Sequence, residues 1–180
     1  MASLCFPLLG ANAASPPVKP YGLASRAVPP PYLNMPHSGA GKLPQLLSQT
    51  GVFQDTAHLV VREGLIPYEL QVPFWSDGAD KLRWISLPQG KIGFAPRGEW
   101  TFPAGTILVK TFELPLDEAH PQLQRRLETR LLVRDSAGGV YGALYKWRAD
   151  NSDADLLPGS LSEDIPVRRA DGTTATQNWY

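Results

Sequence analysis

The stretch of residues 125–148, RRLETRLLVRDSAGGVYGALYKWR, decides the fold class of this chain. Side chains of an extended strand alternate between two faces, and apolar and ionic residues alternate in that way here. One face of residues 125–135 takes Leu127, Thr129, Leu131 and Val133, and the other takes Arg126, Glu128, Arg130 and Arg134. The run Ser-Ala-Gly-Gly at 136–139 predicts a tight turn. One side of the returning segment 140–148 then takes Tyr141, Ala143, Tyr145 and Trp147. The sequence therefore predicts an antiparallel hairpin with one buried face and one ionic face.

The period of two continues upstream of this hairpin. Residues 81–87 alternate, and residues 99–102 and 106–112 are typical of strands on either side of the turn Pro103-Ala104-Gly105. One face of 106–112 takes Ile107 and Val109, and the other takes Leu108, Lys110 and Phe112. The chain also has 16 glycines and 18 prolines, which interrupt long helices and favour short strands. We therefore expect a mainly β fold, an antiparallel sheet or sandwich-like domain.

Two segments before the strands have a different character. Leu43, Leu46 and Leu47 follow the i, i+3, i+4 spacing of a helix, and Gly51 stands where a helix C-cap belongs. This predicts one short N-terminal helix over 43–51. Residues 15–41 are rich in proline and predict an extended linker or strap on the surface of the domain. Residues 42–180 are then a single β-rich domain.

The first 14 residues resemble a signal peptide. A short apolar run, 3–10, precedes the small-x-small pattern Ala11-Asn12-Ala13, although the usual positive charge at the start is missing. An exported protein, periplasmic or secreted from a bacterium, is the corresponding expectation. No run approaches the roughly 18 apolar residues of a membrane-spanning helix. Seventeen basic residues balance 17 acidic ones, so no overall positive field favours binding to nucleic acid.

Candidate binding residues concentrate in the segment 73–85, PFWSDGADKLRWI. Two tryptophans flank a Ser-Asp-Gly turn, and exposed aromatic rings beside polar groups are typical of ligand-binding surfaces. Lys110 lies between apolar neighbours on its face, where it would extend past them, pair with an acid or face a ligand. The full set of ligand-binding candidates is Trp75, Asp77, Asp80, Arg83, Trp84, Lys110, Tyr141, Tyr145 and Trp147. The alternative is that these aromatic side chains form the core.

Metal and catalytic motifs are weaker. His37, His58 and His120 lack the spacing of a metal site, and we expect no metal. The acidic run 150–155 lacks the glycine and distal glutamate of a calcium loop, which favours a hydrated turn. Cys5 is the single cysteine, and no serine stands in a Gly-x-Ser-x-Gly elbow. A complete catalytic set is absent, which leaves open whether the protein is an enzyme. Hydrolysis by paired carboxylates drawn from Asp77, Asp80, Glu99, Glu113 and Glu128 is the weakest hypothesis.

Four motifs in order resemble a poorly characterised family of exported bacterial proteins. They are the segment 73–85, FPAGTILVKTF at 102–112, LETRLLVR at 127–134 and the pair Tyr145 and Trp147. The resemblance covers about residues 43–180. In that family the β-rich region is followed by a Cys-x-x-Cys-His segment that attaches haem c. Members are often fused to, or encoded near, sugar-dehydrogenase-like proteins that use pyrroloquinoline quinone.

The resemblance implies an accessory domain of a c-type cytochrome or oxidoreductase system. Such a domain would position a haem carried by a segment that follows residue 180, and a quinone-dependent dehydrogenase would be its partner. These 180 residues contain no Cys-x-x-Cys-His, so we expect no cofactor attached to this chain itself. The alternative function is a carbohydrate-binding module that uses exposed tryptophan and tyrosine rings. The oligomeric state does not follow from the residues.

Overall fold

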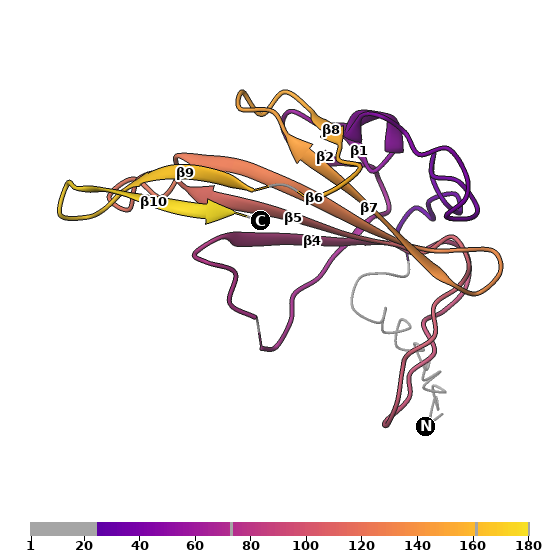
Figure 1. Ribbon diagram of the computed structural model, residues 1–180. Coiled ribbons are helices and arrows are strands. Elements are labelled where there is room, and N and C mark those ends of the chain that lie inside the picture. The colour runs from indigo at the N-terminus through magenta and orange to yellow at the C-terminus, as the bar shows by residue number, and fades with distance from the viewer. Residues whose placement is uncertain (1–24, 73, 161, 180) are drawn as a thin grey trace, which may run out of the picture.

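The computed structural model describes residues 25–72, 74–160 and 162–179 (Figure 1). The expected signal peptide and the first part of the proline-rich segment, 15–24, lie outside the described residues. A six-stranded sheet has the order β3-β4-β5-β6-β7-β8. Its strands are β3 (Ile66–Pro67), β4 (Asp80–Ser86), β5 (Ile107–Pro115), β6 (Gln124–Arg134), β7 (Val140–Trp147) and β8 (Ala154–Leu156). Two-stranded sheets are formed by β1 (Phe53–Asp55) with β2 (Val60–Val61) and by β9 (Glu163–Arg168) with β10 (Thr174–Trp179).

All named strand pairs are antiparallel, which confirms the predicted mainly β class. The architecture is one large sheet with a small two-stranded sheet on each side, rather than two sheets of similar size. The segment 99–102 contributes only an isolated bridge, between Gly93 and Thr101. No helix among the described residues has the length and hydropathy needed to cross a membrane.

The predicted hairpin is the pair β6 and β7. Arg134 pairs with Val140 at its closed end, and the Asp135 N–H donates to the Gly139 carbonyl at 3.0 Å. The Asp135 carboxylate accepts hydrogen bonds from the backbone N–H groups of Ala137 and Gly139, and Gly138 has φ 89°. An aspartate that binds its own downstream backbone and a glycine at positive φ together specify the turn.

The predicted alternation along β6 is wrong at its start, because the strand contains a β-bulge. The pairing with β5 shifts between Phe112 and Glu113, so that Phe112 lies opposite Glu128 and Glu113 lies opposite Arg126. Leu127 is the extra residue, and it packs with Phe112 on the opposite face from Leu131. A bulge inserts one residue into one strand and changes which face the following side chains occupy. Strict alternation could not reveal it.

One face of the large sheet is covered by the N-terminal part of the chain, and we call it the covered face. Its buried side chains include Ile107, Val109, Leu131, Val133, Ala143, Tyr145 and Trp147. Residues from upstream segments pack onto them, namely Tyr32, Met35, Leu47, Val52, Phe53 and Leu65. Burial of such aliphatic and aromatic surface is the main stabilising term of a domain.

The described part of the proline-rich segment runs along this body. The Tyr32 N–H donates to the Gly105 carbonyl at 3.0 Å, and the Tyr141 hydroxyl donates to the Pro36 carbonyl. A Cβ on Gly105, which has φ 83°, would lie 2.7 Å from the Pro31 Cβ. The segment 25–41 and the turn before β5 are therefore in direct contact.

The predicted helix over 43–51 is wrong in extent. Only the 3₁₀ turn η2 (Leu47–Thr50) is helical, and Gly51 follows it with φ 78°, as expected of a cap. Leu46 is extended and forms an antiparallel bridge with Asp155 of β8. Leu47 is fully buried against the sheet. A short helix has little stability of its own, so pairing with a strand edge competes successfully with it.

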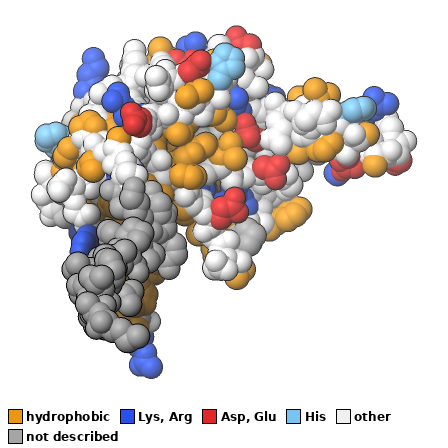
Figure 2. Space-filling model, turned by 180° about the vertical axis from the view of Figure 1, so that it is seen from behind, with side chains coloured by type: hydrophobic (Ala, Val, Ile, Leu, Met, Phe, Trp, Pro, Cys, Tyr) orange, Lys and Arg blue, Asp and Glu red, His pale blue; other side chains and the backbone are white. Residues whose placement is uncertain are grey.

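The hairpin β9–β10 covers one end of the other face of the sheet. A second buried cluster forms there from Ala79, Phe112, Leu114, Leu127, Ile165, Val167 and Trp179. Glu163 ties this hairpin to the sheet through ion pairs with Arg125 of β6 and Lys146 of β7. Figure 2 shows from behind that this end of the molecule projects from the body, and that hydrophobic side chains gather near the middle of the visible surface.

Candidate functional site: an open sheet face with a row of cations

The rest of that second face is not covered by any described strand, and we call it the open face. Its side chains come from β4 to β7 and form two neighbouring rows across the sheet. One row pairs Leu108 with Leu132, and the other is Arg83, Lys110, Arg130 and Leu144. Leu132 is 48% exposed, although the residues on either side of it, Leu131 and Val133, are fully buried on the covered face. Leu132 lies directly opposite Leu108, so the apolar surface here extends over two neighbouring strands.

Three cations stand side by side on adjacent strands within the second row. Arg83 of β4 pairs with Lys110 of β5, and Lys110 pairs with Arg130 of β6. Like charges directly opposite each other on neighbouring strands are destabilising. Arg130 forms an ion pair with Glu128, whereas Arg83 and Lys110 form none with the described acidic residues. The row therefore retains excess positive charge.

The electrostatics of Lys110 reflect this crowding. Its pKa lies below the usual lysine value, because burial disfavours the ammonium and the charges of Arg130 and Arg83 add to that effect. Glu128 acts in the opposite direction and does not offset the shift. Both cations lie near the ring of Phe112, with the Lys110 Nζ 4.9 Å and the Arg130 guanidinium 5.0 Å from its centroid. Cation–π contacts thus take the place of a second carboxylate.

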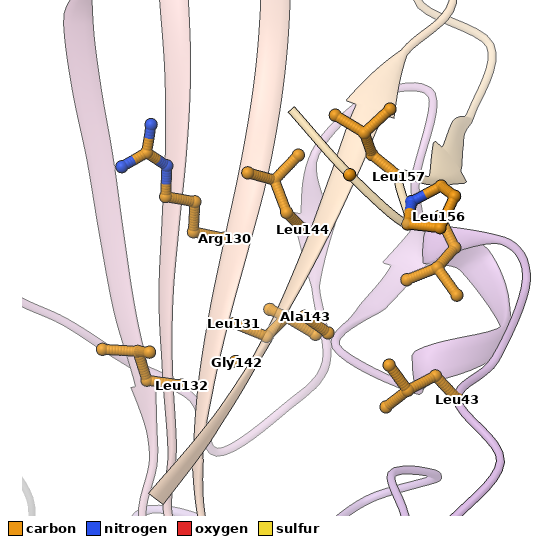
Figure 3. Close-up of a pocket in the computed structure, with 11 residues that line it drawn as sticks. Leu43, Arg130, Leu131, Leu132, Gly142, Ala143, Leu144, Leu156 and Leu157 are labelled. Atoms are coloured by element: carbon orange, nitrogen blue, oxygen red, sulfur yellow. The ribbon is translucent and has the colours of Figure 1, made fainter. Parts of the chain in front are cut away.

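Two hollows lie beside the rows and meet at Leu132. One, of about 510 Å³, includes Arg130, Leu132, Gly142, Leu144 and Leu157. In Figure 3 Arg130 and Leu144 extend from neighbouring strands, and Leu157 and Leu43 lie beyond β7. The other hollow, of about 420 Å³, adds Trp100, Phe102, Leu108, Arg134 and Val140. The two hollows together form an apolar trough that Arg130 and Arg134 line, while Lys110 lies in the neighbouring row and Arg83 lines a separate cleft.

The end of β10 reaches the same region. The Trp179 ring lies 5.2 Å from the ring of Phe112, which is the ring that Lys110 and Arg130 contact. In Figure 1 the arrow of β10 ends close to β5. The Trp179 indole N–H is buried and finds no acceptor among the described residues. A buried donor without an acceptor is uncommon in native proteins.

Four of the nine predicted site residues lie on the covered face. Trp84 packs edge-on against Phe53 with ring centroids 5.7 Å apart, while Tyr145 and Trp147 are fully buried. The Trp147 indole donates to the Thr129 hydroxyl at 2.9 Å, and the Tyr145 hydroxyl donates to the Pro44 carbonyl at 3.0 Å. Burial raises the pKa of Tyr145 to about 12, and that of Tyr141 likewise to about 12. These aromatic side chains belong to the core and its rim.

Trp75 and Asp77 lie in a loop beside the edge of the sheet, and Asp80 is the first residue of β4. Trp75 is 82% exposed, and Asp77 and Gly78 both have positive φ, 49° and 79°. The Ala79 N–H closes this turn on the Ser76 carbonyl at 2.8 Å, which agrees with the predicted Ser-Asp-Gly turn. A cleft of about 660 Å³ joins Phe74 and Trp75 to the polar side chains Glu69, Asp80, Lys81, Arg83, Glu113 and Gln124.

Arg83 and Lys110 are the predicted residues that reach the open face, and sequence reasoning missed their neighbours there. The sequence pattern places Arg130 only on an ionic face, and it does not indicate Leu132 or Leu144 as site residues. The alternation of β6 does place Arg130 opposite the core. Its position beside Lys110 depends on the register with β5, which follows from pairing across the sheet.

The other polar groups considered from the sequence are engaged in local contacts. His58 contacts Asp55 at 2.8 Å and His120 contacts Asp117 at 3.1 Å. The carboxylates in 150–155 serve different partners, Ser152, Ser48 and Arg148. Within the described ranges no three His, Cys, Asp or Glu side chains gather as metal ligands would. Glu113 and Glu128 form ion pairs with Arg126 and Arg130.

Comparison with known proteins adds no relative. No family model, curated protein or solved structure matches the chain. The resemblance to exported domains that precede a haem c segment therefore stays a prediction.

Proposed function

We propose that this protein is an exported accessory domain of a c-type cytochrome or oxidoreductase system. In this proposal the open face receives a haem carried by a segment that follows residue 180 in a longer protein. One observation carries the proposal: an apolar trough with excess positive charge lies at the point where β10 ends. Trp179 sits against Phe112, beside Lys110 and Arg130, so a following segment would begin at this face.

The side chains of the open face match the chemical character of a haem, but they would not attach it covalently. A haem is a flat apolar macrocycle with two carboxylates, and apolar and cationic side chains stand in adjacent rows here. The chain's own residues would bind and orient the group. Leu108, Leu132 and Leu144 would exclude water from its apolar surface, and Arg83 and Lys110 would hold its carboxylates. Covalent attachment and axial ligation would come from the following segment, since redox chemistry belongs to the cofactor.

A haem-c peptide added to the purified chain tests this proposal. We expect saturable quenching of tryptophan fluorescence together with a shift of the Soret band. Leu132→Asp should weaken binding at least tenfold, because it places a carboxylate in the trough. Val60→Asp is the matched control, since Val60 is equally exposed, at 47%, but lies on β2. Equal binding by the two variants would contradict the proposed site.

The coding sequence gives an independent test. Under this proposal the natural reading frame continues past Tyr180 into a Cys-x-x-Cys-His motif, and the longer protein retains haem after denaturation. The longer protein is proposed to be delivered to the periplasm or secreted. A quinone-dependent dehydrogenase is its proposed electron-transfer partner. A longer reading frame without such a motif would exclude the accessory role.

A second candidate function rests on the cleft beside Trp75. An aromatic ring that is 82% exposed stacks well on a sugar face, and Asp80 and Arg83 line the same cleft as hydroxyl-binding groups. Affinity electrophoresis in soluble polysaccharides tests it. Retardation that Trp75→Ala abolishes and Trp100→Ala preserves would favour carbohydrate binding. No retardation with any polysaccharide tested would count against it.

A further inference from the structure

We propose that Arg83, Lys110 and Arg130 form a clamp for the carboxylates of an amphiphilic ligand. The apolar part of that ligand lies on Leu108, Leu132 and Leu144. This inference rests on the proposed function for the identity of the natural ligand, which there is a tetrapyrrole with two carboxylates. The clamp itself follows from the arrangement of charges on the open face.

The first step concerns the number of charges. Three cations occupy adjacent register positions, and the one carboxylate paired with them is that of Glu128, which serves Arg130. Lys81 adds a further positive charge close by, because its ammonium donates only to the neutral Phe74 carbonyl and its charge acts on Lys110. Among the described residues Arg83, Lys110 and Lys81 are thus cations without an acidic partner. Two carboxylates of a bound ligand would neutralise most of that excess.

The second step concerns the stability of the protein. Adjacent like charges destabilise the sheet. Burial lowers the pKa of Lys110, and the charges of Arg130 and Arg83 lower it further. A neutral side chain at position 110 would remove the repulsion from Arg83 and Arg130, at the cost of the cation–π contact with Phe112. Strain of this kind is typical of sites at which a ligand supplies the missing partner.

The third step concerns the type of anion. Arginine presents a planar fork of donors that matches a carboxylate, and two of the three cations are arginines. A strongly hydrated anion would gain nothing from the neighbouring leucine row, whereas an amphiphile would bury its apolar part there.

Fluorescence titration with metal-free protoporphyrin, its dimethyl ester and palmitate tests the clamp. We expect the free acid to bind at least tenfold more tightly than the ester, because only the acid carries carboxylates. The double variant Lys110→Met, Arg130→Gln should remove that preference, and Lys110→Arg should keep it. Arg97→Gln, at an exposed position in the loop between β4 and β5, is the control for loss of a positive charge. Circular dichroism of each variant verifies that it is folded.

The outcomes separate the clamp from the proposed function. Equal affinity for acid and ester would overturn the clamp, even if the haem-c peptide binds. Binding of palmitate but not of protoporphyrin, with loss in the double variant, would support the clamp and contradict the proposed function. Failure of all three ligands to bind would overturn the clamp.

Discussion

At the scale of single residues, the two faces of the central strands differ in how their polar groups are satisfied. On the covered face, the Trp147 indole donates to Thr129, and the Thr129 and Thr111 hydroxyls lie 2.8 Å apart. All three residues are at least 99% buried, so water cannot replace a lost partner and each polar atom depends on its neighbour for a hydrogen bond. On the open face, Arg83 and Lys110 have no carboxylate partner among the described residues. Satisfied polar groups stabilise the fold, and incompletely paired charges are available to a ligand.

Thr129→Val should lower the free energy of unfolding by about 1–3 kcal/mol, because it leaves the Trp147 N–H without its acceptor in the core. Thr129→Ser keeps the hydroxyl and should cost less. Denaturation in urea measures both, with Thr176→Val on the exposed side of β10 as the control. If Thr129→Val behaved like Thr176→Val, the hydrogen-bonded chain would not matter to stability.

Lys110→Met should raise the free energy of unfolding by roughly 0.5 kcal/mol, because it removes a cation that stands opposite Arg83 and Arg130. The same change should weaken binding of a carboxylate ligand, a trade of stability for function. Lys91→Met, at an exposed position, should leave stability unchanged. A loss of stability in Lys110→Met would show that Lys110 has a stabilising partner.

At the scale of elements, the β9–β10 hairpin determines how much of the second face stays open. The β-bulge in β6 turns Leu127 toward this hairpin, where it packs with Ile165, Val167 and Trp179. Glu163 also holds the hairpin on the sheet, through its ion pairs with Arg125 and Lys146. Burial alone would raise the pKa of Glu163, but hydrogen bonds from Lys146 and Arg125 hold it below the usual value of 4.5. The hairpin thus depends on an ionised carboxylate.

Glu163→Gln should therefore destabilise the protein by about 0.5–1 kcal/mol at pH 7. Because the folded pKa is depressed, the contribution of Glu163 is fully present above about pH 4.5 and is lost as the pH falls through the folded value. The difference between wild type and variant should shrink in that acidic range. Urea denaturation from pH 7 to pH 3 measures it, with Glu99→Gln as the control. A difference that did not change with pH would contradict the ionic role.

At the scale of the whole molecule, local patterns predicted the mainly β class, the β6–β7 hairpin and the Ser-Asp-Gly turn. These local patterns gave wrong predictions where contacts with distant segments determine the conformation of a residue or the face it occupies. Leu46 pairs beside β8 instead of continuing a helix, and the bulge moves Leu127 to the other face. The candidate site was predictable in part, because Arg83 and Lys110 were identified. Their alignment with Arg130 depends on the register of three strands, which a single strand's residues do not contain.

Methyl NMR of leucine-labelled protein during titration with a haem-c peptide tests the central claim most directly. We predict shifts at Leu108, Leu132 and Leu144, which lie on the open face, and none at Leu131, which is fully buried on the covered face. In a second, ¹⁵N-labelled sample the Trp75 indole signal should also stay unchanged. Shifts confined to the Trp75 loop, or no shifts at the three open-face leucines, would contradict the account.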